Sequence, residues 1–230
     1  MKFSRKLIKG TIIDVHSNLI ADVEFENGAV EAVFCPNPDR VKTLYKRGAD
    51  VWSMPIDNTN KKVRYEATIV ENDKGLVMVN PHYRYDIFAE AFENNILDDF
   101  DEYDSIESLD ENDTRLSFRL SNEEGKECYV YICNIYNKQN GYAVFPSFVD
   151  FREFTVYSEL DEIRKSGIDT YFIIMVVRTD YKGVKFTWNL DPVASAKAFD
   201  EARNGLKFSC YSCNLDTSGI EISQKIDIKF

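Results

Sequence analysis

Short apolar runs separated by polar residues fill the first 80 residues of the chain, a pattern typical of β-strands. The runs are "GTIIDVH", "LIADVEFENGAVEAVF", "ADVWSM", "VRYEATIVE" and "GLVMVN". Several short strands in succession predict a small β-barrel, of which the OB-fold is one common type.

Asn27-Gly28 is a strong signal for a hairpin with a two-residue turn. Such a turn would place Glu24 directly opposite Glu31, and like charges in that arrangement repel each other. A bulge or a longer loop at this hairpin is therefore a second possibility.

After Pro81 the pattern changes to helical runs that alternate with strands. The first predicted helix, "DIFAEAFENNIL", places on one face Phe88, Ala91, Phe92, Asn95 and Ile96. The second, "DFREFTVYSELDEIRKSG", opens with Asp150 and Glu153 in capping-box spacing and stops at Gly167. Its apolar residues at helical spacing are Phe151, Phe154, Tyr157, Leu160 and Ile163.

The last predicted helix, "DPVASAKAFDEARNG", has the clearest boundaries. Asp191 is placed at the N-cap, Pro192 at the first helical position and Gly205 just past the end. Strands are predicted from "TRLSFRLS", "CYVYICNIY", "YFIIMVV" and "LKFSCYSC". The fold class is therefore mixed α+β, with an OB-like barrel at residues 1–84 and an α/β domain at residues 85–230.

The segment "ECYVYICNIY" reads as a buried strand of aromatic and β-branched residues. Residues two apart in a strand point to the same side. One face of this strand is therefore predicted to carry Tyr129, Tyr131, Cys133 and Ile135.

The net charge of −11 argues against a generic nucleic-acid-binding protein, because the phosphate backbone attracts positive charge. The charge is unevenly distributed, however. Residues 1–85 hold 13 Lys and Arg against 11 Asp and Glu, whereas residues 86–230 hold 15 against 28.

Between Asp98 and Asp113, nine of sixteen residues are acidic. We interpret this segment as a solvated connector, with a metal site or a surface for a basic partner as alternatives.

The five cysteines are an odd number in a chain large enough to fold without disulfides, so free thiols in a reducing compartment are expected. Cys210 and Cys213 have the spacing of zinc ligands, but on a strand they would point to opposite faces. We interpret them as core thiols, and His16 and His82 as surface histidines. The chain contains no signal-peptide core, no membrane span, and no nucleotide or hydrolase fingerprint, so we expect a cytoplasmic protein with no cofactor.

The ordered set of motifs resembles the sugar fermentation stimulation protein family over nearly the whole chain. The motifs are "FCPNPDRV", "RGADVW", "KKVRYEATIVE", "VMVNPHYRYDIFAEAF", "TRLSFRL", "YVYICNI", "VFPSFVDFREF" and "LDPVASAKAFDEARNGLKF". The resemblance implies an N-terminal OB-like barrel, a second domain similar to restriction endonucleases, and an association with DNA binding.

Nucleases of this type hold Mg²⁺ with an acid on a helix, an Asp on one strand and the Glu of a Glu-x-Lys pair on the next. The resemblance places the helix acid at Glu90 and the strand Asp at Ser117. It places the Glu and Lys of the pair at Tyr131 and Cys133. The family's Phe-Pro-Asp becomes Phe145-Pro146-Ser147. The positions of Glu90, Ser117, Tyr131 and Cys133 are therefore interpreted as vestiges of a nuclease site, and no metal is expected there.

Three functional hypotheses follow. The first is a catalytically inactive member of the family that binds DNA weakly and without sequence preference. Its phosphate contacts would come from basic residues of the first domain, namely Arg5, Lys6, Lys9, Arg40, Lys42, Lys46, Arg47, Lys61, Lys62 and Arg64. The alternative interpretation of each residue is an ordinary solvated surface charge. The second is a module that binds an unknown protein partner through the former cleft, and the third an active nuclease whose acids come from another segment. No membrane interaction is expected.

Overall fold

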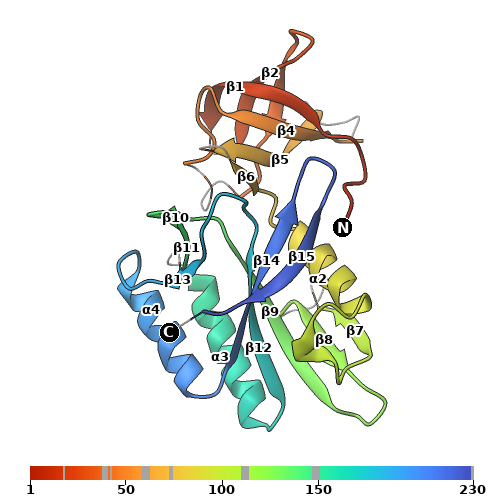
Figure 1. Ribbon diagram of the computed structural model, residues 1–230, viewed down its shortest axis with the longest axis vertical. Coiled ribbons are helices and arrows are strands. Elements are labelled where there is room, and N and C mark those ends of the chain that lie inside the picture. Colours follow the sequence, from red (N-terminus) through yellow and green to blue (C-terminus); the bar gives the residue numbers. More distant parts are fainter. Residues whose placement is uncertain are drawn as a thin grey trace. The chain divides into compact units, whose positions relative to one another are not determined.

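The computed structural model describes residues 1–17, 19–37, 41, 43–57, 63–72, 75–109, 114–146 and 151–228, apart from the side chains of residues 17 and 151–154. The chain divides into two compact units (Figure 1). The first consists of Met1–Tyr83, Val177–Asp180 and Asn214–Glu221. The second consists of Arg84–Val176, Tyr181–Cys213 and Ile222–Phe230.

A five-stranded barrel forms the first unit. Its strands are β1 (Ile8–Ser17), β2 (Ile20–Phe25), β3 (Val30–Phe34), β4 (Asp50–Pro55) and β5 (Tyr65–Asn72), with β6 (Gly75–Met78) paired to β5. The order β3–β2–β1–β4–β5 is closed by a parallel pairing of β3 with β5. Alternate residues of β2 point inward, namely Ala21, Val23 and Phe25. The predicted OB-like barrel is thus confirmed.

The hairpin between β2 and β3 has the longer loop. The Phe25 N–H donates to Ala29 O at 2.9 Å, and Gly28 adopts a φ of 79°, which glycine tolerates without strain. In the resulting register Glu24 lies opposite Val30, and Glu31 opposite Val23. The two glutamates are therefore not cross-strand partners.

Two segments from the second half of the chain complete the first unit. Arg178 forms a bridge with Val77, and its guanidinium holds the Asp180 carboxylate through bonds of 2.6 and 2.9 Å. Both side chains of this ion pair are buried. Near the N-terminus, the Phe3 N–H donates to Ser218 O at 3.0 Å.

The second unit is built on a six-stranded sheet with the order β15–β14–β12–β9–β8–β7. Its strands are β7 (Ser105–Ser108), β8 (Phe118–Ser121), β9 (Glu127–Ile135), β12 (Asp169–Val176), β14 (Lys207–Leu215) and β15 (Ile220–Ile226). β12 runs parallel to β9 and β14, whereas β8 is antiparallel to β9. β8 begins at Phe118, so the strand predicted from Thr114 starts later than expected.

Helices cover both faces of this sheet. On one face, called here the α3/α4 face, α3 (Phe151–Lys165) and α4 (Pro192–Arg203) lie side by side (Figure 1). This face carries the predicted row of β9, because Tyr131, Cys133 and Ile135 belong to the same buried cluster as Leu160 and Ala198. The opposite face, the α2 face, contacts α2 (Tyr83–Glu93) through Phe88, whose ring stacks on Phe118 at 5.4 Å.

The ends of the helices follow the capping signals only in part. At α4, the Asp191 side chain accepts from the Val193 and Ala194 N–H groups, as predicted. α2 ends at Glu93, so Asn95 and Ile96 lie beyond the helix, and Ile96 is exposed; the predicted five-residue face was wrong in this part. Ser147 and Asp150, and the side chains of Phe151, Glu153 and Phe154, lie outside the described residues.

The acidic segment is more structured than a solvated connector. It contains a 3-10 helix, η1 (Asp98–Phe100), and strand β7, and it buries Phe100 and Tyr103. The Tyr211 hydroxyl donates to Asp99 at 2.7 Å. A small separate sheet, which the sequence pattern did not predict, joins β10 (Lys138–Gln139), β11 (Tyr142–Phe145) and β13 (Val184–Phe186).

Candidate functional site

Ser117, at the position of the nuclease Asp, is fully buried just before β8. Its N–H donates to Val130 O at 2.8 Å, and its hydroxyl oxygen accepts from the Ile132 N–H at 3.1 Å. β8 begins only at Phe118. The Ser117 hydroxyl therefore accepts from the β9 backbone in place of a backbone carbonyl of β8. This bond satisfies a buried donor, which would otherwise cost free energy of folding.

Tyr131 and Cys133, at the positions of the Glu-x-Lys pair, are only 7% and 5% exposed. The Tyr131 ring lies 5.0 Å from the ring of Phe172, its neighbour on β12. Cys133 lies next to Ile174 in the same register. An aromatic ring and a thiol thus take part in the packing of the α3/α4 face.

Further aromatic side chains fill the space beside this row. The ring of Tyr157, from α3, stacks on Phe172 at 5.2 Å, and Phe145, from β11, approaches Phe172 at 5.7 Å. Val156 and Leu160 belong to the same buried cluster. A hard cation needs several oxygen ligands, and this packing presents mainly carbon surface to the row.

Glu90 is not part of that cluster. It lies on α2 and is exposed, while the buried residues of α2 are Ile87, Phe88, Ala91 and Phe92. Phe88 contacts Phe118, whose neighbour Val130 faces away from Tyr131. The four predicted positions therefore comprise one exposed carboxylate and three buried side chains. Among the described residues, no three His, Cys, Asp or Glu side chains are grouped as a metal site would require.

Arg84, which the sequence analysis did not single out, lies in the first turn of α2. Its Nη2 donates to the Tyr85 hydroxyl at 2.7 Å, and its guanidinium carbon lies 4.7 Å from the centre of the Tyr85 ring. Burial alone would lower the pKa of Arg84, but electrostatic interaction with the phenols of Tyr85, Tyr131 and Tyr136 raises it. The one available signal was a lone arginine between two tyrosines, just before the helix predicted from Asp86.

The thiols are sequestered. All five cysteines are buried, and none of them forms a disulfide bond. Burial raises the pKa of Cys35, Cys128, Cys210 and Cys213 to about 12, so these groups are protonated thiols at neutral pH. Cys210 packs on the α3/α4 face, and the strand alternation places Cys213 on the other side, as predicted.

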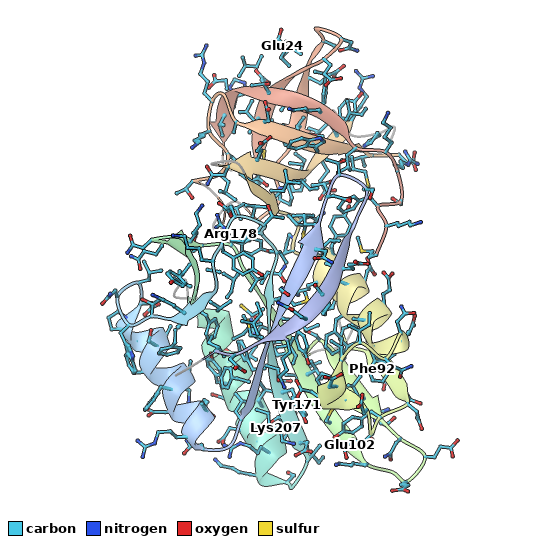
Figure 2. All side chains as sticks on the ribbon, in the orientation of Figure 1. Glu24, Phe92, Glu102, Tyr171, Arg178 and Lys207 are labelled. Carbon is cyan, nitrogen blue, oxygen red and sulfur yellow. The ribbon has the colours of Figure 1, made fainter. Side chains whose placement is uncertain are left out.

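A cluster of charges occupies the amino ends of the parallel strands on the α2 face. Lys207 binds Asp169 at 2.8 Å and donates to the Tyr171 hydroxyl at 3.3 Å. Lys126 binds Glu102 at 2.6 Å (Figure 2, where Glu102, Tyr171 and Lys207 are labelled). These charges pair with one another, which fits a structural role.

Some of the residues predicted to contact DNA are described by the structure, and others lie outside the described residues. Lys9 binds Asp50 at 2.8 Å and Arg64 binds Glu31 at 2.6 Å, while Arg5 pairs with Asp57. Lys6 is exposed. Arg40, Lys42, Lys61 and Lys62 lie outside the described residues. Lys46 and Arg47 are described and exposed as well. Three of the six described cations, namely Arg5, Lys9 and Arg64, are thus already bound by carboxylates.

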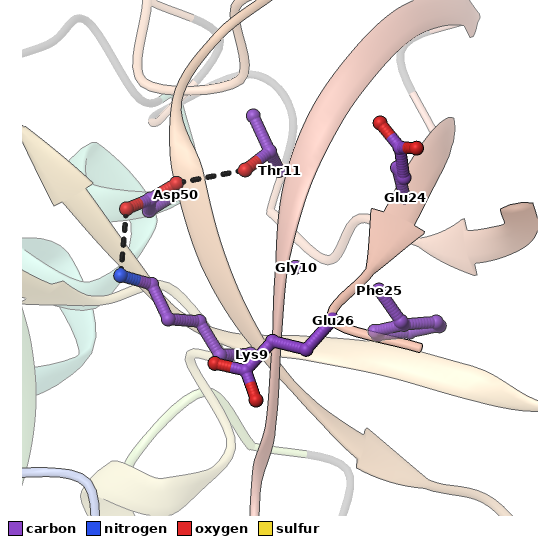
Figure 3. Close-up of a pocket in the computed structure, with 7 residues that line it drawn as sticks. All are labelled: Lys9, Gly10, Thr11, Glu24, Phe25, Glu26 and Asp50. Carbon is purple, nitrogen blue, oxygen red and sulfur yellow. Dashed lines mark hydrogen bonds and ion pairs between the residues drawn. The ribbon is translucent and has the colours of Figure 1, made fainter. Parts of the chain in front are cut away.

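An open pocket of about 360 Å³ lies beside Lys9 on the barrel (Figure 3). Three carboxylates line it, those of Glu24, Glu26 and Asp50, together with Thr11, Phe25 and Gly10. Asp50 accepts from both Lys9 and the Thr11 hydroxyl, which lies at 2.9 Å. The hydrogen bond to Asp50 raises the pKa of Lys9, and this effect outweighs burial, which lowers the pKa. The acidic lining does not favour a phosphate.

Within the described parts of the chain, no helix is both long and apolar enough to span a bilayer.

His16, the first of the two histidines, is an exposed residue of β1 that binds Asp22 at 2.5 Å.

Comparison with known proteins matches both units. Residues 82–219 match the family described as "Sugar fermentation stimulation protein RE domain", and residues 19–79 match "SfsA N-terminal OB domain". A sugar fermentation stimulation protein homolog of Paramagnetospirillum magneticum is 28% identical, over 96% of this chain and 95% of that protein. The homolog of Pelagibacter ubique is also 28% identical, over 99% of both chains.

Among solved structures, the chain resembles Pyrococcus furiosus SfsA, described as being in complex with Ca²⁺. The TM-score is 0.85 over 100% of this chain and 98% of that one, at 16% sequence identity. At this identity the likeness establishes the shared fold.

Proposed function

The chain belongs to the sugar fermentation stimulation protein family, and we propose that it is a member without nuclease activity that binds DNA weakly and without sequence preference. The observation that carries the first part is the burial of Tyr131 and Cys133 in the apolar cluster of the α3/α4 face. Metal-dependent phosphodiester cleavage needs carboxylates to hold the ion and a cation to stabilise the phosphate. A phenol and a thiol supply neither at neutral pH.

The P. furiosus relative was solved with Ca²⁺, an ion that takes six to eight oxygen ligands. In this chain the exposed Glu90 provides one carboxylate, and Ser117 uses its oxygen to accept a backbone N–H. Tight binding of Ca²⁺ or Mg²⁺ at these positions is therefore not expected.

Weak DNA binding is assigned to the barrel. The second half of the chain carries a net charge of −13 and would repel a duplex, whereas residues 1–85 carry +2. The ion pairs of Arg5, Lys9 and Arg64 reduce the positive charge available to phosphates. A dissociation constant on the order of micromolar or weaker at physiological salt is expected.

Fluorescence anisotropy of the full chain with a labelled duplex and a labelled single strand tests this part. Binding should be independent of base sequence and weaken steeply as salt is raised. No binding at low salt, where electrostatic attraction is greatest, would contradict DNA binding and leave the protein-partner hypothesis. Because Tyr131 and Cys133 are buried, a partner would have to contact other surfaces than these two side chains.

A further inference from the structure

The dipeptide Asn-Gly occurs three times in the chain, at Asn27-Gly28, Asn140-Gly141 and Asn204-Gly205. In such a pair the backbone nitrogen of the glycine can attack the side-chain amide of the asparagine, because glycine has no side chain to obstruct the approach. The attack has two structural requirements. The glycine N–H must not be held in a hydrogen bond, and the backbone must be able to rotate until its nitrogen reaches Cγ of the asparagine.

Asn140 and Gly141 form the two-residue turn between β10 and β11 (Figure 1). Gln139 pairs with Tyr142 across the turn, and φ is positive at both turn residues, 52° at Asn140 and 82° at Gly141. These values are typical of a type I′ hairpin turn. Among the described residues, the Gly141 N–H has no acceptor and the exposed Asn140 side chain has no hydrogen-bond partner. The nucleophile and the group that it attacks are therefore both available.

The pair in the barrel hairpin is held by hydrogen bonds. The Gly28 N–H donates to Phe25 O at 2.8 Å. The Asn27 side-chain oxygen accepts from the Ala29 N–H at 3.0 Å. Both the nitrogen and the amide of this pair are thus already bound.

The pair at the end of α4 is held in a similar way. The Gly205 N–H donates to Ala202 O at 3.2 Å, and the Asn204 N–H donates to Asp200 O at 2.9 Å. The Arg164 guanidinium donates to Asn204 O. Attack at Asn204 would have to break these bonds first.

The turn at Asn140 is also the easiest of the three to open. β10 consists of only two residues, and it lies at the edge of its three-stranded sheet. β2 and β3, in contrast, pair at five positions within the barrel, and Gly205 is followed by the buried Leu206. Local opening costs least where few backbone bonds and little buried apolar surface are involved. The rotation that the attack requires therefore needs the least free energy at Asn140.

A positive charge lies beside the same turn. The Lys182 N–H donates to Gly141 O at 2.8 Å, and Nζ of Lys182 lies 3.7 Å from the position that a Cβ on Gly141 would occupy. During the attack the Gly141 nitrogen loses its proton, and negative charge develops on the side-chain oxygen of Asn140. A nearby ammonium group stabilises such charge.

We propose that Asn140 is a site of spontaneous deamidation and that Lys182 promotes the reaction. The Gly141 nitrogen bonds to Cγ of Asn140, the C–N bond of the side-chain amide breaks, and the amide nitrogen leaves as ammonia with the proton lost by Gly141. Water then opens the resulting cyclic imide at one of its two carbonyl carbons, which yields aspartate or isoaspartate. No oxidant, reductant or cofactor takes part.

The modification changes both the charge and the backbone of the turn. Either product adds a negative charge beside the Lys182 ammonium, and isoaspartate also adds one carbon atom to the main chain. The loop length sets the register of a hairpin, so the longer turn no longer fits the pairing of Gln139 with Tyr142. β10 should therefore loosen, whereas β11 remains paired with β13. The proposal is independent of DNA binding by the barrel, since this hairpin belongs to the second unit.

Peptide mapping by mass spectrometry of the folded full chain, incubated at mildly alkaline pH, tests the proposal. Asn140 should convert at least about fivefold faster than Asn27 or Asn204, because its turn opens more readily. Both aspartate and isoaspartate should appear there. In the chain unfolded with guanidinium chloride, the three sites should convert at similar rates, because the bonds that distinguish them are lost.

Lys182→Gln should slow the conversion of Asn140 by about two- to fivefold in the folded chain, because it removes the stabilising charge. The matched control is Lys6→Gln, which removes an exposed lysine of the barrel and should leave the rate unchanged. The proposal is overturned if Asn140 does not convert before Asn27 and Asn204 in the folded chain, or if it leads by the same margin in the unfolded chain. An unchanged rate in Lys182→Gln would refute the part assigned to the lysine.

Discussion

Tyr131 and Cys133 of β9, which the family resemblance aligns with nuclease residues, and the basic residues Lys9 and Arg64 of the barrel are held in place by different interactions. In the second unit, Tyr131 and Cys133 pack against Phe172 and Ile174 in a buried cluster. In the first unit, Lys9 and Arg64 keep their charges and bind the carboxylates of Asp50 and Glu31. Packing is difficult to reverse, because restored charges would be buried. Surface ion pairs are readily reversed by salt, pH or a single substitution.

The largest effect is expected from restoring the nuclease residues. Ser117→Asp, Tyr131→Glu and Cys133→Lys, made together, should destabilise the fold, because each buried charge without an assured partner can cost several kcal/mol. Urea unfolding followed by circular dichroism measures the loss. The control makes similar changes at exposed positions, Ser105→Asp, Ile96→Glu and Val30→Lys, and should remain near wild type. A triple variant that melts like the wild type and gains Mg²⁺-dependent cleavage would show that the site is preformed.

A smaller loss is expected from Phe172→Ala. This ring is fully buried and contacts Tyr131, Phe145 and Tyr157, so its removal should cost about 3–5 kcal/mol. Trp188→Ala is the matched aromatic control, because Trp188 is 46% exposed and should cost much less. Equal losses in the free energy of unfolding would mean that the aromatic cluster contributes no special stability.

Removing the carboxylates that pair with the barrel cations should change DNA binding more than the free energy of unfolding. Asp50→Asn with Glu31→Gln frees Lys9 and Arg64, and the free energy of unfolding should fall by only about 1 kcal/mol or less per pair. In DNA titrations the log–log salt slope should steepen by up to about 1.8, for two added phosphate contacts.

Glu102→Gln with Glu107→Gln is the control for this pair of changes, since it alters the net charge equally but in the second unit. Equal gains in DNA affinity from both double variants would assign the effect to net charge. No gain from either would count against phosphate contacts by the barrel.

The smallest expected effect is the pH dependence of the Lys9–Asp50 pair. The hydrogen bond from Lys9 lowers the pKa of Asp50 below its unfolded value. The stabilisation is therefore complete above the unfolded pKa, near 4, and is lost as the pH falls through the lower folded pKa. Because the pair is partly exposed, the difference between wild type and Asp50→Asn should change by less than about 1 kcal/mol between pH 7 and pH 2. If the difference in the free energy of unfolding between the wild type and Asp50→Asn grew as the pH fell, this prediction would be contradicted.

Local signals predicted part of this molecule well. Asp191, Pro192 and Gly205 define α4 because capping depends on neighbouring backbone groups, and strand alternation correctly assigned Tyr131 and Cys133 to one face. The ion pairs of the barrel were missed because the partners are distant in the sequence: Lys9 and Asp50 meet only when β1 pairs with β4.

Calorimetric titration of the full chain with Mg²⁺ and Mn²⁺, in the wild type and in Glu90→Ala, tests the central claim most directly. If packing has replaced the metal site, neither ion should bind the wild type with micromolar affinity, and Glu90→Ala should give the same titration. A micromolar site in the wild type that disappears in Glu90→Ala would contradict the account and show that the chain retains a metal-dependent centre.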